Sequence, residues 1–187
     1  IVLCTYVTLY ISGILNLLGI YVGVGSHRSI ALALLLTLTF LNRPAREKDR
    51  DRLRWYDILF IVMSVLPCGY WVLYQDAIWE HRYSGFATPT EVVLCFFLVV
   101  ALLEAGRRVI DWILPAIALA FIIHPLVSGY MPSFLHAKGL SIQRIVSVFY
   151  LSESGIFGQT VGVATTVVIT FMIFSQEEAK LTYLIPL

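Results

Sequence analysis

The sequence has little charge. Lysine, arginine, aspartate and glutamate together make up 13% of the 187 residues, whereas hydrophobic residues make up 59%. Soluble domains carry roughly 25% charged residues, so the apolar surface of this chain exceeds what one soluble core buries. The net charge is only +1, and no basic excess points to a nucleic acid. These shortages predict an integral membrane protein without a nucleic-acid partner.

Cysteine and catalytic motifs are also scarce. Cys4, Cys68 and Cys95 lie in apolar runs without CxxC spacing, so we predict three small core residues and neither a disulfide framework nor a zinc site. Histidines occur at 27, 81, 124 and 136 without HxxxH or HExxH spacing, and we expect them at interfacial loop tips. A P-loop and a nucleophile elbow are missing. We therefore assign no catalytic, cofactor-binding or metal-ligating residue.

Long hydrophobic runs, in contrast, are abundant. A helix needs about 20 apolar residues to cross a bilayer, because its backbone must satisfy its own hydrogen bonds in lipid. Six runs approach this length, at 2–22, 29–41, 57–74, 90–103, 113–128 and 155–174. They predict an all-α, polytopic membrane protein with about six transmembrane helices.

Basic residues favour one orientation of these runs. The stretch NRPAREKDRDRLRWYD, between the second and third runs, holds six lysines and arginines. Basic residues in short loops stay on the cytoplasmic side. Alternating the loops then places nine basic residues inside and four outside. We predict that both chain ends face the cytoplasm.

Two stretches carry helix-start signals. In TPTE, Thr88 can cap a helix, Pro89 suits its first position and Glu91 can close a capping box. In GLSIQRIVSVFYL, residues 139–151, Ser141 is a plausible cap and the apolar residues gather on one side. This second helix is too short to span, so we expect it to lie in the outer membrane interface.

A polar cluster, LLEAGRRVIDW, closes the fourth run. Glu104 lies three and four residues before Arg107 and Arg108, so it can pair with either arginine on one helix face. At the cytoplasmic end of a span, this arrangement favours a positive-inside anchor with a local ion pair. The alternative is a site for a transported ion or a proton, which would place ionised groups at a cost within the membrane.

Three glycines open the last run, in SESGIFGQTVGVATT. Gly155, Gly158 and Gly162 advance by three and four residues, so they would share one face of a helix. The pair Gly158 and Gly162 has the small-xxx-small spacing that lets two membrane helices approach closely. We predict a helix-packing face. The alternative is a surface that lines a path for something that moves.

These patterns leave three kinds of function open: a component of an ion-coupled transporter, a membrane enzyme with a dispersed site, and a structural subunit. From Pro89 onward, the sequence resembles the fused permease of a tripartite ATP-independent periplasmic (TRAP) transporter, in its TAXI branch. The markers are Leu103-Glu104-Ala105 with Arg107-Arg108, Leu114-Pro115, the 139–146 segment, and Gly155-Ile156-Phe157-Gly158 followed by Gly162-Val163. Weaker similarity reaches back through RWYDILF to the first two runs.

The resemblance implies a division of the chain and a function. Residues 1–104 would correspond to the small membrane subunit, with four helices, and residues 105–187 to the start of the large permease subunit, which continues in the family. Such permeases, in the cytoplasmic membrane of bacteria and archaea, import an organic anion such as a carboxylate with a sodium gradient. The implied partners are a periplasmic solute-binding protein, the remainder of the permease and membrane lipid.

Two departures from the family limit what is carried over. Gly106 and Gln159-Thr160 replace residues that vary little in the family. The serine- and glycine-rich hairpins that hold sodium and substrate have no counterpart, so no residue of this chain is assigned to either. The outer loops 75–90 and 128–143 are candidate contacts for the binding protein. We expect a transporter component rather than an enzyme, and the alternative is a non-transporting scaffold subunit that organises partners.

Overall fold

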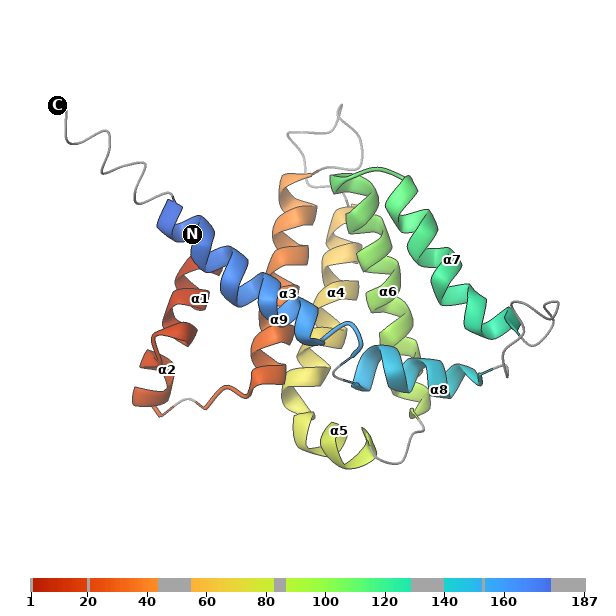
Figure 1. The fold of residues 1–187 in the computed structure, drawn as a ribbon, viewed down its shortest axis with the longest axis horizontal. Coiled ribbons are helices and arrows are strands. Elements are labelled where there is room, and N and C mark those ends of the chain that lie inside the picture. The colour runs from red at the N-terminus through yellow and green to blue at the C-terminus, as the bar shows by residue number, and fades with distance from the viewer. Residues whose placement is uncertain are drawn as a thin grey trace.

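The computed structural model describes residues 2–19, 21–43, 55–82, 87–128, 140–152 and 154–175. Every regular element in these ranges is helical, which confirms the all-α prediction for this part of the chain. Four helices run alternately up and down, side by side, in Figure 1. They are α3 (Val24–Asn42), α4 (Trp55–Leu73), α6 (Pro89–Val109) and α7 (Ile113–Val127).

The core lies between α3, α4 and α6. Its fully buried side chains include Phe40 of α3, Cys68 of α4 and Leu98 of α6, each 1% exposed or less. Cys95 is buried as well, so two of the three cysteines are the small core residues that the sequence predicts. Cys4 is exposed, and the prediction for it is wrong, because the N-terminal run packs only part of its surface on the bundle.

The first hydrophobic run is not the single spanning helix expected over 2–22. It forms α1 (Val2–Ile11) and the short α2 (Ile14–Leu17), which are separated by Gly13 at φ +71°. Gly19 also has a positive φ, a conformation that ends a helix and that glycine adopts without strain. At 10 residues, α1 rises only about 15 Å, half of a bilayer core.

The other predicted runs are helical, with shifted ends. α3 begins at Val24, before the expected 29, and α6 continues to Val109 through the boundary expected between 104 and 105. Thr88 accepts a hydrogen bond from the backbone N–H of Glu91, and the Glu91 carboxylate accepts one from the Thr88 N–H at 2.7 Å. The predicted capping box is therefore confirmed.

Three shorter segments close one end of the bundle and cross its face. α5 (Gln75–Arg82) is helical within the expected outer loop 75–90. The helix expected over 139–151 is present as α8 (Ile142–Val146) and the π-helical turn η3 (Ser147–Leu151), with Ser141 as its cap. α9 (Gln159–Val163) and η4 (Ala164–Val168) continue as one apolar helix to Ser175.

Two described helices, α3 and α4, are long and apolar enough to cross a membrane. α7 and the helix from Gln159 to Ser175 are apolar but shorter.

The residues at which the sequence departs from the TRAP pattern lie at two places. Gly106 is in α6, where a Cβ atom would stand 3.4 Å from Cγ of Pro115 in α7, so the small residue allows the two helices to pack closely. Gln159 and Thr160 are exposed at the start of α9.

Candidate functional site

One end of the bundle holds a buried ion network. Glu104 Oε1 lies 2.5 Å from Nη2 of Arg107 and 2.9 Å from Nε of Arg108, so both pairs that the spacing allows are formed. Arg108 also reaches across to α4, where its Nη1 lies 2.6 Å from Oδ1 of Asp57. Two carboxylates thus face two guanidinium groups, and the network is neutral as a whole.

Arg108 is the centre of this network. Its side chain is 1% exposed and that of Asp57 is 3% exposed. Nη1 also donates to the carbonyl of Arg43 at the end of α3, at 3.2 Å. The guanidinium carbon lies over the rings of Phe40 and Phe60, 4.9 and 5.5 Å from their centroids. Arg108 therefore ties α3, α4 and α6 together through charge, hydrogen bonds and aromatic contacts.

Asp57 is the partner that the sequence did not identify. It lies 51 positions from Arg108, as the last residue of the stretch NRPAREKDRDRLRWYD, and no sequence pattern indicated a pairing with Arg108. The only signal was its place at the start of an apolar run, where an acid in the first turn of a helix is favourable but common. The local pairing of Glu104 follows from helix geometry, whereas the pairing of Asp57 depends on tertiary packing.

The three glycines are arranged differently from the shared helix face that we expected. Gly155 lies in a turn before the helix, Gly158 is the N-cap of α9, and only Gly162 lies within it. The prediction that the three glycines share one helix face is therefore wrong, because the helix begins at Gln159 and not at residue 155. The role of these glycines in helix packing stays a prediction.

Two of these glycines are in close contact with other parts of the chain. A Cβ atom at Gly155 would stand 2.2 Å from the carbonyl oxygen of Phe149, which accepts a hydrogen bond from Ile156 at 2.8 Å. A Cβ atom at Gly162 would stand 2.8 Å from Nε of Arg28 in α3. The turn 154–158 thus folds back on η3, while α9 lies against the N-terminal part of α3.

An aromatic cluster fixes this turn to α4. The Phe157 ring lies 5.5 Å from that of Trp71 and 5.7 Å from that of Tyr150, measured between centroids. Trp71 Nε1 donates to the Tyr150 carbonyl at 3.0 Å, and the Tyr150 hydroxyl donates to the carbonyl of Pro67 at 2.7 Å. Burial raises the pKa of Tyr150, so its hydroxyl stays protonated and able to donate.

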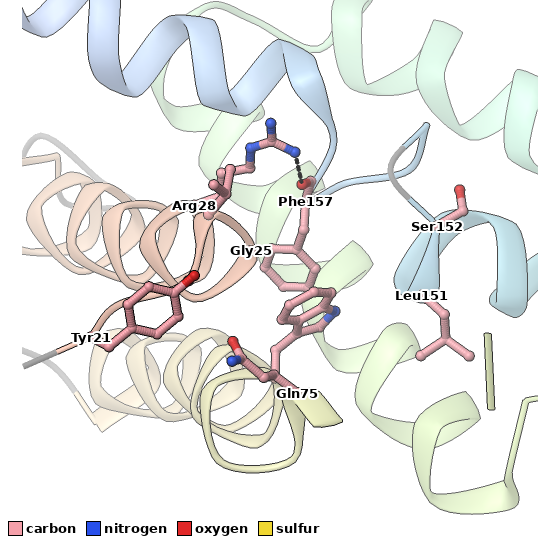
Figure 2. A pocket seen from close by; sticks show the side chains of 10 residues that line it. Tyr21, Gly25, Arg28, Gln75, Leu151, Ser152 and Phe157 are labelled. Carbon is pink, nitrogen blue, oxygen red and sulfur yellow. Dashed lines mark hydrogen bonds between the residues drawn. The ribbon is translucent and has the colours of Figure 1, made fainter. Parts of the chain in front are cut away.

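A cavity of about 440 Å³ lies between this cluster and the start of α3. Figure 2 shows Tyr21, Arg28 and Gln75 on one side of the hollow, and Leu151 and Ser152 on the other. Among the described residues that line it, Arg28 is the only charged one. Nη1 of Arg28 donates to the carbonyl of Phe157 at 3.4 Å, so the guanidinium is attached to the glycine turn (Figure 2).

The N-terminal helix covers a buried histidine next to Arg28. His27 is 1% exposed and its ring stacks on Tyr10 at 3.6 Å between centroids, with Nδ1 3.3 Å from the Tyr6 hydroxyl. The expectation of an interfacial loop tip is wrong for His27. α3 begins before this residue, and Tyr6 and Tyr10 of α1 pack over its ring. His136, with most of the outer loop 128–143, lies outside the described residues.

Comparison of the chain with protein-family models, with curated proteins and with solved structures gives no match. The candidate sites are therefore defined by the geometry of this chain alone. They are the ion network at one end of the bundle and the cavity beside Arg28 at the other.

Proposed function

We propose that the chain is a multi-pass membrane protein, the N-terminal portion of a TRAP-type secondary transporter permease. The observation that carries the membrane part is the exposure of large apolar side chains along whole helices. Soluble monomers rarely expose contiguous apolar patches larger than a few hundred Å². Here α4, α7 and the helix from Gln159 to Ser175 expose large apolar side chains along their lengths, and a lipid environment removes the cost of that exposure.

α7 and the last helix are the clearest cases. Ile113 and Phe121 of α7 are 72% and 73% exposed, and only Pro115 of this helix is buried. Phe171 and Phe174 of the last helix are 75% and 67% exposed. In Figure 1, α7 lies beside α6 at the edge of the bundle, and the last helix crosses the face of α3. Together with α3, α4, α6 and the N-terminal segment, they are the six membrane-embedded segments of the proposal, although α1 is too short to span alone.

The transport part of the proposal rests on the ordered markers of the resemblance. In this proposal, an organic anion such as a carboxylate is delivered by a periplasmic binding protein and imported with a sodium gradient. The end with the ion network faces the cytoplasm, which agrees with the basic residues around it, and the end with α5 and the cavity faces outward. Sodium and substrate are held by the remainder of the permease, because this chain offers no assigned ligand for either.

A scaffold subunit is the second candidate. The neutral ion network favours it, because Asp57, Glu104, Arg107 and Arg108 already neutralise one another. A carboxylate that is paired with two guanidinium groups is a poor sodium ligand, since the cation would have to displace them. In this reading, the chain organises partner proteins and moves nothing itself.

Reconstitution separates the two candidates. The chain is expressed together with the DNA that follows the codon for Leu187, and the product is placed in proteoliposomes with a panel of radiolabelled carboxylates. A transporter shows uptake that requires both an inward sodium gradient and the soluble binding protein. Uptake that is indifferent to sodium and to the binding protein would defeat the TRAP-type proposal, and assembly with partners in the absence of any uptake would favour the scaffold.

A further inference from the structure

Arg28 has hydrogen-bond donors to spare. A guanidinium group carries five N–H donors. The described residues offer it one acceptor, the Phe157 carbonyl at the long distance of 3.4 Å, and the ion pairs of this part of the chain do not include it. Its Nε is buried without a partner and lies against Gly162 of α9, so the donors left for a ligand are those at the Nη end. A partly buried cation in this state attracts an anion.

The surroundings of Arg28 favour negative charge. In Figure 2 the hydroxyl of Tyr21 and the amide of Gln75 lie on the same side of the cavity as Arg28, and Gln75 Oε1 accepts a hydrogen bond from the Ser26 hydroxyl. α3 has 19 residues, and its N-cap residue, Gly23, provides no side-chain cap. The first-turn N–H groups of this long helix therefore add a partial positive charge at the cavity wall. The described part of the cavity lining contains no acid.

The size and the apolar wall of the cavity indicate an organic ligand. A volume of about 440 Å³ is far more than an inorganic ion fills, and it falls within the range of roughly 300–1,000 Å³ that holds small organic molecules. Trp71 and Phe157, whose rings are in contact, provide an aromatic wall beside the guanidinium. One part of the ligand is therefore charged and another is apolar.

We propose that this cavity binds the carboxylate or phosphate of a small organic anion, and that Arg28 recognises its charge. A soluble molecule and a lipid headgroup both present such oxygens, and the shared chemistry is an oxyanion beside an apolar body. The proposal does not depend on transport. Binding is measured on the purified chain, so its failure and the failure of the proposed function are distinguishable.

The first experiment compares two charged probes and one neutral probe on the unmodified protein. The chain is placed in phosphatidylcholine nanodiscs, and the binding of benzoate, phenyl phosphate and benzamide is measured by calorimetric titration. Benzamide has the outline of benzoate without its charge. Loss of a charge-assisted contact weakens binding by about tenfold or more, so we expect that benzamide binds at least about tenfold more weakly. Equal binding of benzoate and benzamide would overturn the proposal.

Two substitutions assign the charge to Arg28. Arg28→Gln removes the charge, and we expect it to weaken benzoate binding by about tenfold or more. Arg28→Lys keeps the charge and a donor for the Phe157 carbonyl, and it should retain most of the affinity. Arg144→Gln, at an exposed position on α8, is the matched control and should bind as the unmodified protein does. Unchanged affinity in Arg28→Gln would contradict the assignment.

A third series distinguishes the two sources of the oxyanion. Phosphatidylglycerol replaces part of the phosphatidylcholine in the nanodiscs, and the benzoate titration is repeated with the unmodified protein and with Arg144→Gln. Competition that grows with phosphatidylglycerol identifies a lipid headgroup as the occupant. Unchanged benzoate affinity identifies a soluble anion. Absence of charge-dependent binding in both kinds of disc would refute the site itself.

Discussion

The two ends of the α3–α4–α6 bundle each place an arginine next to aromatic rings, but the arginines have different partners. Arg108 is 1% exposed and contacts two carboxylates and a carbonyl. Arg28, at the other end, lines a cavity and has one carbonyl partner among the described residues and no carboxylate. The same residue type is thus paired with carboxylates at one end of the molecule and lines a cavity at the other.

This difference indicates that the charge of Arg108 stabilises the fold, whereas the charge of Arg28 is able to bind a ligand. The carboxylates beside Arg108 neutralise its charge, although its buried Nη2 has no hydrogen-bond partner, and removal of one carboxylate leaves an uncompensated charge. A cation that faces a cavity without an acid can gain a partner from solution. We therefore expect substitutions at the ion network to change stability, and substitutions at Arg28 to change binding.

The largest effect on stability is expected for Asp57→Ala. This change leaves Arg108 buried with one carboxylate fewer, and we expect a loss of about 3 kcal/mol in the free energy of unfolding. The measurement is unfolding of the purified chain in mixed detergent micelles. Asp111→Ala, which removes an exposed acid near the same end, is the control and should change the free energy by less than about 0.5 kcal/mol. Equal effects at the two positions would show that the network is no more than a surface feature.

An intermediate effect is expected for Gly155→Ala. The added Cβ atom would meet the Phe149 carbonyl at 2.2 Å, so the turn must open and its hydrogen bond from Ile156 is lost. We expect a destabilisation of about 2 kcal/mol in the same assay. Gly69→Ala is the control, because nothing lies within 4 Å of its Cβ position, and alanine in a helix gains about 0.5–1 kcal/mol over glycine. A neutral result at Gly155 would mean that the turn is not closely packed.

The smallest effect is expected for Thr88→Ala, at the cavity end of α6. This change removes the acceptor for the Glu91 N–H and breaks the capping box, at a cost of about 1 kcal/mol. Thermal unfolding followed by circular dichroism measures it. Thr88→Ser keeps the hydroxyl and should behave as the unmodified protein does. A full loss in Thr88→Ser would show that the methyl group matters and the cap does not.

Local sequence signals predicted the parts of the fold that local physics determines. The Thr88 capping box, the Ser141 cap and the pairing of Glu104 with its two arginines each involve residues three or four positions apart, so helix geometry alone brings them together. The runs of apolar residues likewise predicted where α3, α4, α6 and α7 lie, although their ends shifted by a few residues.

The remaining features depend on contacts between distant residues. Asp57 meets Arg108 across 51 positions, and Arg28 meets the Phe157 carbonyl across 129. The glycine spacing at 155, 158 and 162 fits one helix face as well as it fits a turn followed by a helix. The turn is held by contacts with distant or non-helical partners, namely Phe157 with Trp71 and Ile156 with the Phe149 carbonyl. Gly13 and Gly19 broke a run that hydropathy alone makes continuous.

The most direct test of the account labels the two ends of the bundle from outside the cell. Cys4, Cys68 and Cys95 are replaced by alanine, and a single cysteine is introduced as Asp76→Cys at the cavity end or as Asp111→Cys at the network end, both exposed positions. Intact cells are treated with a membrane-impermeant maleimide. We predict that position 76 is labelled in intact cells and that position 111 is labelled only after permeabilisation. Labelling of position 111 in intact cells, or release of the chain from the membrane by alkaline carbonate, would contradict the account.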